Sequence, residues 1–422
     1  PDEILERCRY VWSNGKTAAF SAAAREQAKR GLAEMTEAGL RVLAIGMHPK
    51  AAQMEESGLT FLGMAGMEDP VRPEAAEAVE QFARAGVRTV MITGDRADTA
   101  LAIARQLGIA ERGDECVTGE EMERMDEQML AERISRTRVF AHVSPEHKVR
   151  IVSACKKNGE IVAMTGDGVN DAPSLKSADV GIAMGMAGTD VARNAADMVL
   201  ADDNFATIVK AVKNGRNVYA NIKRAIQFLL SGNTAGILTV LYASLMGLPV
   251  PFAAVHLLFI NLLTDSLPAI ALGMEPHTDE VMSEKPRPRN EGILTKRFLY
   301  SVGVEGLVIA AATVTAFYLG LNAGGAAAGQ TMAFSTLCLS RLFHGFSCKS
   351  QHPVLLTRHF WNNRALLGAF TIGALLLGLV LLVPALEPLF AVAPLSIGMV
   401  GAIVGLAFGS MVVIQLLKLI RQ

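Results

Sequence analysis

The sequence predicts a protein of two different halves: an α/β half built on a parallel sheet, followed by an all-helical half that crosses a membrane six times. Two observations support this prediction. Residues 1–217 carry most of the charge, and short β-branched runs alternate there with helical segments. Residues 218–422 are dominated by Leu, Ala, Val, Gly and Phe, and they contain six long apolar stretches.

Composition narrows the class of protein. A chain of 422 residues is too long for one ordinary domain. The formal net charge of −1 argues against a nucleic-acid-binding protein, which normally shows a basic excess. The five cysteines are scattered without a CxxC pair, which indicates reduced thiols rather than disulfides or a zinc site.

In the first half, strand and helix patterns alternate from residue 59 onward. Strand-like runs occur at 59–67, 87–94, 138–143, 160–166, 180–184 and 198–201. Helix-like segments lie between them at 72–86, 96–108 and 145–159. Alternation of this kind with apolar, β-branched strands predicts a doubly wound parallel sheet.

Two of the predicted strands end in the same motif. MITGD covers residues 91–95, and MTGD covers residues 164–167. One Thr-Gly-Asp is weak evidence, because Gly and Asp are common in turns. Ligands of parallel α/β sheets bind beyond the carboxyl ends of the strands, so two such motifs predict one shared site.

Phosphoryl transfer is the chemistry that suits these strand ends. The Thr93 hydroxyl and the Gly94 amide can donate hydrogen bonds to phosphate oxygens. Lys148, in SPEHK, supplies a compact positive charge that would balance a phosphoryl group. Taken singly, Asp95 is better explained as a helix cap and Lys148 as a solvated lysine. A simple turn would not require Thr93, Gly94, Asp95 and Lys148 all together.

The second motif continues into a group of oxygen ligands. Asp167 and Asp171 offer carboxylates and Asn170 a neutral oxygen, which are ligands that suit Mg²⁺. A bound Mg²⁺ would polarise and orient phosphoryl oxygens. The alternative is that residues 167–171 form only a tight turn.

The second half contains stretches that are each close to the roughly 20 residues needed to cross a bilayer. They lie at 226–248, 254–274, 299–321, 327–346, 366–386 and 395–420. The alternative, six consecutive buried helices in half of a soluble protein, would be very unusual.

Loop charges predict the orientation of these spans. Lys and Arg occur before the first stretch, after the second, after the fourth and after the sixth, and the remaining loops contain neither. Basic residues mark the cytoplasmic side of a membrane. Both ends of the helical block, and with them the whole first half, are therefore predicted to be cytoplasmic.

Polar residues within the spans predict a cation site. Asn261, Thr264 and Asp265 are spaced i, i+3 and i+4, which would place them on one helix face. Pro268 would free a backbone carbonyl, as in the ion-binding spans of transporters. Asn233 lies at a comparable depth in the first span. A carboxylate, an amide and carbonyls suit a hard cation such as Ca²⁺, although the two asparagines could instead only join helices.

The string TGDGVNDAPSLKSADVGIAMG, together with MITGD, DPVRP and SPEHK, resembles the P-type ion-pumping ATPases. The resemblance covers essentially the entire chain. It implies an α/β haloacid-dehalogenase-like (Rossmann-like) cytosolic domain followed by an all-α membrane domain of six transmembrane helices. Residues 1–58 would be the tail of a nucleotide-binding domain, 59–217 the second part of the phosphorylation domain, and 218–422 the transmembrane domain.

The resemblance also implies roles for individual residues, with ATP and Mg²⁺ as cofactors. The phosphoryl group would be contacted by Thr93, Gly94, Asp95 and Lys148. Mg²⁺ would be bound by Asp167, with Asn170 and Asp171 beside it. The nucleotide would lie near Arg41, a phosphate-contacting arginine, and near the hinge residues Asp69 and Arg72.

One element of the family is missing from this sequence. The phosphorylated aspartate of the family lies in an Asp-Lys-Thr-Gly-Thr motif, which does not occur here. The chain is therefore expected to be the carboxyl-terminal part of a longer pump, whose missing amino-terminal part is its partner. Alone it should not hydrolyse ATP, because the covalent nucleophile is absent.

The second span, LLFINLLTDSLPAIALGMEP, is similar to that of the calcium-transporting members. The resemblance therefore implies an integral membrane protein of the cell membrane that exports Ca²⁺ from the cytosol. Gly236 stands where the two-calcium reticulum pumps have glutamate, which predicts one Ca²⁺ per cycle. Arg341 falls near another acidic ligand of those pumps, where it could fill the vacated site, snorkel, or pair with Asp265.

Three other functions are compatible with parts of the sequence. The chain could belong to a related pump for H⁺, Na⁺ or Mn²⁺. It could be a haloacid-dehalogenase-type phosphatase tethered to an unrelated membrane anchor, which would leave Asn261 and Asp265 unexplained. It could also be a non-catalytic interaction module.

Overall fold

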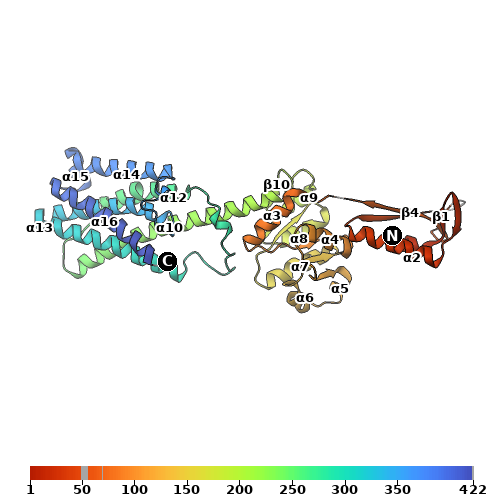
Figure 1. Ribbon diagram of the computed structural model, residues 1–422. Helices are drawn as coiled ribbons and strands as arrows, with labels where there is room; N and C mark the ends of the chain where they lie inside the picture. The colour runs from red at the N-terminus through yellow and green to blue at the C-terminus, as the bar shows by residue number, and fades with distance from the viewer. Residues whose placement is uncertain (49–55, 69, 421–422) are drawn as a thin grey trace. The chain divides into compact units, whose positions relative to one another are not determined.

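The computed structural model describes residues 1–48, 56–68 and 70–420. These residues form two compact units (Figure 1). The first unit comprises Pro1–Val212 with Glu280–Arg289, and the second comprises Lys213–Asp279 with Asn290–Gln422. The division into 1–58, 59–217 and 218–422 stays a prediction.

The first unit opens with a four-stranded sheet in the order β2-β1-β4-β3. Its elements are α1 (Asp2–Arg7), β1 (Cys8–Ser13), β2 (Lys16–Ala19), α2 (Ala22–Glu37), β3 (Arg41–Met47) and β4 (Leu59–Met67). Asn14 and Gly15 both adopt positive φ between β1 and β2, as a two-residue hairpin turn requires. The core of this part contains Leu5, Leu32 and Phe61.

Six further strands form two parallel three-stranded sheets, in the orders β5-β7-β6 and β10-β9-β8. The strands are β5 (Met91–Ile92), β6 (Cys116–Thr118), β7 (Val139–Ala141), β8 (Ala163–Gly166), β9 (Val180–Met184) and β10 (Met198–Leu200). Parallel pairing is as predicted, but the hydrogen bonding makes two sheets instead of one. Ile92 of β5 packs against the core that contains Met164 of β8 and Val152, so side chains, not a ladder, join the two sheets.

Helices alternate with these strands, as the sequence predicts. They are α3 (Pro73–Arg84), α4 (Ala97–Gln106), α5 (Gly119–Glu123), α6 (Glu127–Ile134), α7 (Pro145–Lys157), α8 (Ala172–Ser177) and α9 (Asp190–Ala195). The start of α7 is set locally. Ser144 accepts a hydrogen bond from the His147 amide, and Pro145 occupies the first helical position. This cap places Lys148 at the end of the first helical turn.

The segment Glu280–Arg289 follows α12 (Ser266–Gly273) in the sequence but belongs to the first unit. Arg289 pairs with Asp179 at 3.0 Å. Pro286 lies so close to Gly86 that an added Cβ there would come within 2.5 Å of the proline ring. Gly86 also has a φ of +71°, so glycine is required at this position on both grounds.

The second unit is helical. Among the described residues, five helical segments are long and apolar enough to cross a membrane. They are α10 (Ala206–Leu245), Ala254–Gly273, α13 (Lys296–Cys348), α14 (Arg364–Leu382) and α16 (Ile397–Ile420). Many large apolar side chains on these helices are exposed, including those of Ile237, Leu262, Leu375 and Ile397. An apolar outer surface of this kind fits contact with lipid.

Helix α13 folds back on itself. At 53 residues a straight helix would be about 80 Å long, far more than a bilayer requires. The backbone is not helical at Gly324 and Gly325. An added Cβ at Gly320 would lie 2.6 Å from the Cα of Gly329, whereas nine residues of straight helix span about 13 Å. Residues 296–323 and 326–348 are therefore two arms of a hairpin, called here the first and second arms.

The tight contact between the arms gives a stability prediction. We expect Gly320→Ala in the full-length protein to destabilise it by about 1–3 kcal/mol, because the added methyl meets backbone that cannot move aside. Gly303→Ala on the same arm is the matched control, since nothing lies within 4 Å of its added Cβ. Thermal unfolding in detergent measures both. Equal midpoints for the two variants would contradict the hairpin packing.

Candidate functional site

The first candidate site begins at the end of β5. The Thr93 hydroxyl donates a hydrogen bond to Asp95 Oδ2 at 3.0 Å and accepts one from the Asp95 amide at 3.1 Å. Helix α4 has Arg96 as its N-cap, without a side-chain cap bond. Asp95 therefore does not serve as the helix cap that was the simpler explanation.

Lys148 is not a solvated lysine. Its ammonium lies 2.6 Å from Asp171 Oδ1, and the two side chains are 19% and 9% exposed. The other oxygen of Asp171 accepts hydrogen bonds from the amides of Gly168 at 3.1 Å and Asp167 at 3.3 Å. An added Cβ at Gly166 would lie 2.5 Å from the Cβ of Asp171, so the end of β8 must be glycine for this carboxylate to fit.

The side chains of Asp167 and Asn170 are exposed beside this pair. The Asp167 carbonyl accepts a hydrogen bond from the Thr189 amide at 2.8 Å, which holds the turn. Mg²⁺ binds through one or two carboxylates and keeps several waters, so the exposed Asp167 carboxylate with the neighbouring Asn170 fits this ion. Asp171 forms an ion pair with Lys148. Its predicted position beside the metal therefore does not make it a direct ligand of the ion.

One short segment connects the end of β5 to the start of α7. Thr93 donates its amide hydrogen to the Phe140 carbonyl and accepts one from the Val143 amide. The next residue, Ser144, caps the helix that carries Lys148. The described contacts thus join Thr93 to Lys148 through residues 140–144.

The predicted nucleotide residues Arg41 and Arg72 lie on different elements. Arg41 is exposed at the first position of β3, and Asp69 lies outside the described residues. Arg72 donates a hydrogen bond to the Asp203 carbonyl at 2.9 Å. The Asp203 carboxylate accepts from the three successive amides of residues 185–187, and the bonds from Met186 and Ala187 lower its pKa. Arg72 is thereby held at the strand end of β9.

The second candidate site is in the second unit, at a break in a helix. A π-helical turn, η2 (Ile260–Asp265), separates α11 (Ala254–Phe259) from α12 (Ser266–Gly273). Pro268 has no N–H for the carbonyl four residues earlier, and turns of this kind are frequent at functional sites.

The π turn corrects one prediction. Thr264 and Asp265 are buried, but Asn261 is exposed, so the three do not share a face. The reason is the wider turn, which has i→i+5 bonding and changes the angular spacing on which the i, i+3, i+4 argument depends. The Asn261 carbonyl accepts a hydrogen bond from the side-chain hydroxyl of Ser266 at 3.1 Å.

Asp265 forms a buried ion pair with Arg341 of the second arm, and both side chains are less than 5% exposed. Arg341 also donates to the Asn233 side chain of α10 at 3.4 Å. An added Cβ at Gly232 would meet the guanidinium at 2.4 Å, so glycine makes room for it. Of the three roles left open for Arg341, the structure has the pairing with Asp265.

Several buried polar atoms around this pair have no partner among the described residues. Asp265 Oδ1 and Arg341 Nε are two of them, and two others are the hydroxyls of Thr336 and Ser340 on the same arm as Arg341. One carboxylate oxygen thus stays available for a cation. Sequence reasoning missed Thr336 and Ser340, although hydroxyls within an apolar span are a recognisable signal.

Comparison with known proteins matches both units. A family model described as haloacid dehalogenase-like hydrolase matches residues 4–179, and one described as cation transporting ATPase, C-terminus, matches residues 249–420. The chain is 41% identical over 398 residues to a calcium-transporting ATPase of Bacillus subtilis (strain 168), covering 92% of this chain and 45% of that protein. The chain belongs to the P-type cation-transporting ATPases.

Other members of this ATPase family are similar over the whole chain. Calcium-transporting ATPase 1 of Bacillus cereus (strain ATCC 10987 / NRS 248) is 40% identical over 443 residues, and human calcium-transporting ATPase type 2C member 1 is 37% identical over 426 residues. Each match covers 100% of this chain but only 50% and 45% of the relative. The chain therefore spans about half the length of the curated relatives it matches.

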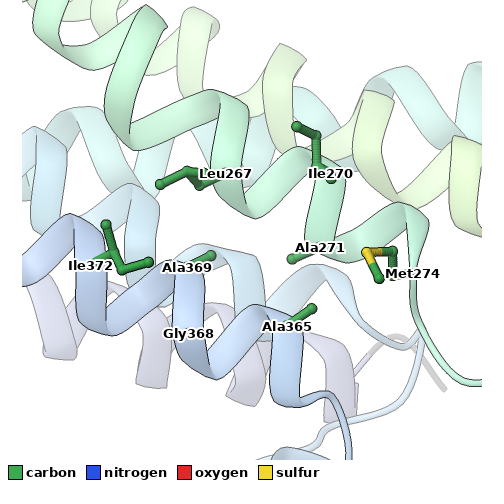
Figure 2. Close-up of a pocket in the computed structure, with 8 residues that line it drawn as sticks. All are labelled: Leu267, Ile270, Ala271, Met274, Ala365, Gly368, Ala369 and Ile372. Carbon is green, nitrogen blue, oxygen red and sulfur yellow. The ribbon is translucent and has the colours of Figure 1, made fainter.

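The helical second unit also has an apolar pocket between α12 and α14, with a volume of about 220 Å³ (Figure 2). It is lined by Leu267, Ile270, Ala271, Met274, Ala365, Gly368, Ala369 and Ile372. None of these side chains offers an oxygen ligand for a hard cation such as Ca²⁺, so the pocket does not form the Ca²⁺ site.

Proposed function

We propose that this chain is the carboxyl-terminal part of an ATP-driven pump that exports Ca²⁺ from the cytosol through an aspartyl phosphate. The observation that carries the proposal is the buried Asp265, which keeps one carboxylate oxygen unpaired at a helix break. Burying an ionisable side chain within an apolar span costs free energy, and residues of this kind are typical of ion sites. The printed names of the relatives, calcium-transporting ATPases, support Ca²⁺ as the cargo.

We propose six membrane spans, with the two arms of α13 counted separately. Both arms exceed the roughly 20 residues that a span requires. The basic loops then lie on one side together with the first unit, which makes that unit cytoplasmic. The proposed location is the cell membrane.

In the cytosolic part, Thr93 and Gly94 would donate hydrogen bonds to the phosphoryl oxygens, and Lys148 would neutralise their charge. Asp171 would position Lys148 and the turn that carries Asp167. When bound at Asp167 near Asn170, Mg²⁺ supplies further neutralisation of phosphoryl charge. The nucleophilic aspartate would come from a part of the protein outside this chain.

Asp95 would hold the Thr93 hydroxyl in place for the phosphoryl group through the hydrogen bond they share. ATP would lie near Arg41, Asp69 and Arg72, the last of which is anchored to the Asp203 carbonyl.

In the membrane part, Ca²⁺ would be ligated by Asp265 with oxygens of Asn233 and Thr264, whereas the exposed Asn261 would not take part. Ca²⁺ would bind Oδ1 of Asp265, the oxygen that Arg341 leaves unpaired. Gly236 supplies no carboxylate for a second ion. The proposal is therefore one Ca²⁺ per cycle.

Transport by the full-length protein in sealed vesicles tests this proposal. With ATP outside, we expect uptake of labelled Ca²⁺ and an acid-stable phosphoenzyme that forms only when Ca²⁺ is present. The ratio of bound Ca²⁺ to phosphorylation sites should be one, and a ratio of two would refute the stoichiometry. Phosphorylation that depends on H⁺, Na⁺ or Mn²⁺ instead would identify that ion, and not Ca²⁺, as the cargo. Phosphatase activity without ion dependence would favour the tethered phosphatase.

A further inference from the structure

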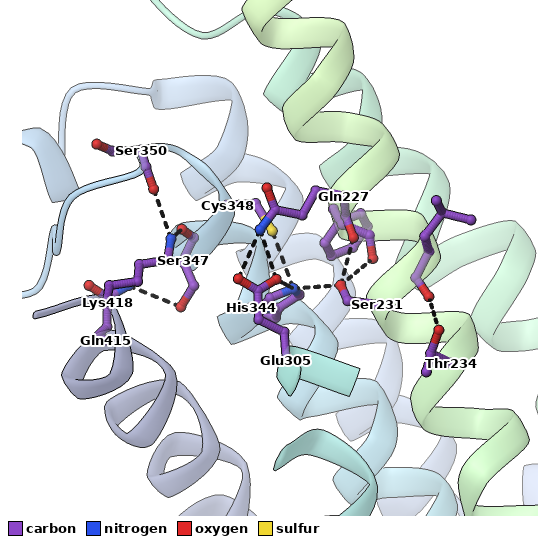
Figure 3. Close-up of polar contacts among 12 residues, drawn as sticks. Gln227, Ser231, Thr234, Glu305, His344, Ser347, Cys348, Ser350, Gln415 and Lys418 are labelled. Carbon is purple, nitrogen blue, oxygen red and sulfur yellow. Dashed lines mark hydrogen bonds and ion pairs between the residues drawn. The ribbon is translucent and has the colours of Figure 1, made fainter. Parts of the chain in front are cut away.

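A second group of potential ligands lies in the helical unit, apart from Asp265. Glu305 of the first arm and His344 and Cys348 of the second arm are buried, and their ligand atoms all lie within 4.8 Å of one another. Figure 3 shows the three side chains converging, with Gln227 and Ser231 of α10 beside them. His344 and Cys348 are four residues apart and so share one helix face.

The distances within this group suit a small metal ion. His344 Nε2 lies 3.2 Å from Cys348 Sγ and 3.5 Å from Glu305 Oε2. Around a tetrahedral Zn²⁺, with bonds of about 2.0–2.3 Å, neighbouring ligand atoms lie about 3.3–3.8 Å apart. A small closing movement of the thiol and the carboxylate would complete the geometry.

The surroundings hold the ligands in place. Gln227 donates hydrogen bonds to both oxygens of Glu305, at 2.8 and 2.9 Å. Ser231 donates its hydroxyl hydrogen to the main-chain carbonyl of Gln227 at 2.6 Å, and its oxygen lies 2.7 Å from His344 Nε2. His344 Nδ1 has no partner among the described residues, so no contact prevents the proton from moving there and freeing Nε2. Partners that orient ligands in this way are a regular feature of metal sites.

Charge and ligand softness select the class of ion. A divalent cation bound by the Glu305 carboxylate, the Cys348 thiolate and a neutral His344 is balanced by its own ligands, which suits a low-dielectric interior. The positive charges of Lys418 and Arg341 lie nearby and would oppose the metal. Thiolate and imidazole favour Zn²⁺ and similar transition metals, whereas Ca²⁺ and Mg²⁺ prefer oxygen ligands.

We propose that Glu305, His344 and Cys348 form a buried site for a divalent transition metal of the Zn²⁺ class, with Ser231 or water as the fourth ligand. The metal would bind to the sulfur as the Cys348 S–H bond breaks and the proton leaves to solvent, so affinity rises with pH. Binding would tie α10 to both arms of α13. The site shares no ligand with the proposed Ca²⁺ site, and it does not depend on the proposed function.

Cobalt substitution in the full-length protein tests the proposal. After metal removal, one equivalent of Co²⁺ should produce a near-ultraviolet sulfur-to-cobalt charge-transfer band, which Zn²⁺ abolishes by competition. Cys348→Ser should remove the band. Cys338→Ser, which alters another buried cysteine of the same arm, should leave it intact. Glu305→Gln should weaken Zn²⁺ binding by about 10-fold or more while the hydrogen bond to Gln227 persists.

Each outcome of these experiments either supports or overturns the proposed metal site. Loss of the band in Cys348→Ser but not in Cys338→Ser, in protein that stays monodisperse, supports the site. A wild-type protein without the band, a band that survives Cys348→Ser, or unchanged Zn²⁺ affinity in Glu305→Gln overturns it. Should Cys348→Ser fail to fold, the Glu305→Gln titration decides. Since the readout is spectroscopic, a negative result leaves the Ca²⁺ proposal standing, and failure of Ca²⁺ transport leaves the metal site standing.

Discussion

Asp265→Asn in the full-length protein is expected to abolish Ca²⁺-dependent phosphorylation and Ca²⁺ uptake. The substitution removes the buried carboxylate that the proposed site uses for the cation. It also leaves the Arg341 guanidinium buried without its anionic partner. Breaking a buried pair in this way costs about 3–5 kcal/mol, so the variant should also unfold at a lower temperature.

A double variant separates the two effects. Asp265→Asn combined with Arg341→Met removes both charges, and replacing a buried pair by uncharged groups is often neutral or stabilising. We expect the double variant to recover thermal stability but not Ca²⁺ uptake, which distinguishes a lost ion ligand from a damaged fold. Uptake by Asp265→Asn with wild-type Ca²⁺ affinity would show that the ion binds elsewhere.

Lys148→Ala is expected to lower the rate of phosphoenzyme formation by about 10²–10³-fold, the size typical of a lost electrostatic contact to a transition state. The variant removes the ammonium that pairs with Asp171, whose other oxygen keeps its bonds from the Asp167 and Gly168 amides. The turn should therefore persist, and equilibrium Ca²⁺ binding by the membrane unit should be unchanged. Rapid-quench phosphorylation and a Ca²⁺ titration measure the two quantities.

Lys157→Ala is the matched control, because Lys157 lies on the same helix and pairs with Glu127 at 3.0 Å on the surface. Surface substitutions of this kind usually change stability by less than about 0.5 kcal/mol. Equal phosphorylation rates for the Lys148 and Lys157 variants would remove Lys148 from the proposed phosphoryl site.

Features with a local cause were predicted well from the sequence. Strand and helix alternation, parallel pairing and the long apolar stretches follow from periodicity and composition, which each segment carries in its own residues. The two Thr-Gly-Asp motifs lie at strand ends as predicted, at β5 and β8. The structure also connects Thr93 to the cap of the helix that carries Lys148.

Features that depend on distant residues were decided only by the tertiary structure. The π turn before Pro268 exposes Asn261, which ideal helical spacing could not foresee. The partner of Arg341 is 76 positions away in Asp265, and both had to be buried together for the pair to form.

The sequence by itself therefore determined the fold class and the residue types available for phosphoryl and cation chemistry, because these depend on composition and on spacing within one element. Only the tertiary structure decided which polar groups inside the helical unit meet. There, helix packing brings Glu305 to His344 and Asp265 to Arg341. A buried charge costs free energy unless it is paired, and its partner can lie far away in the sequence.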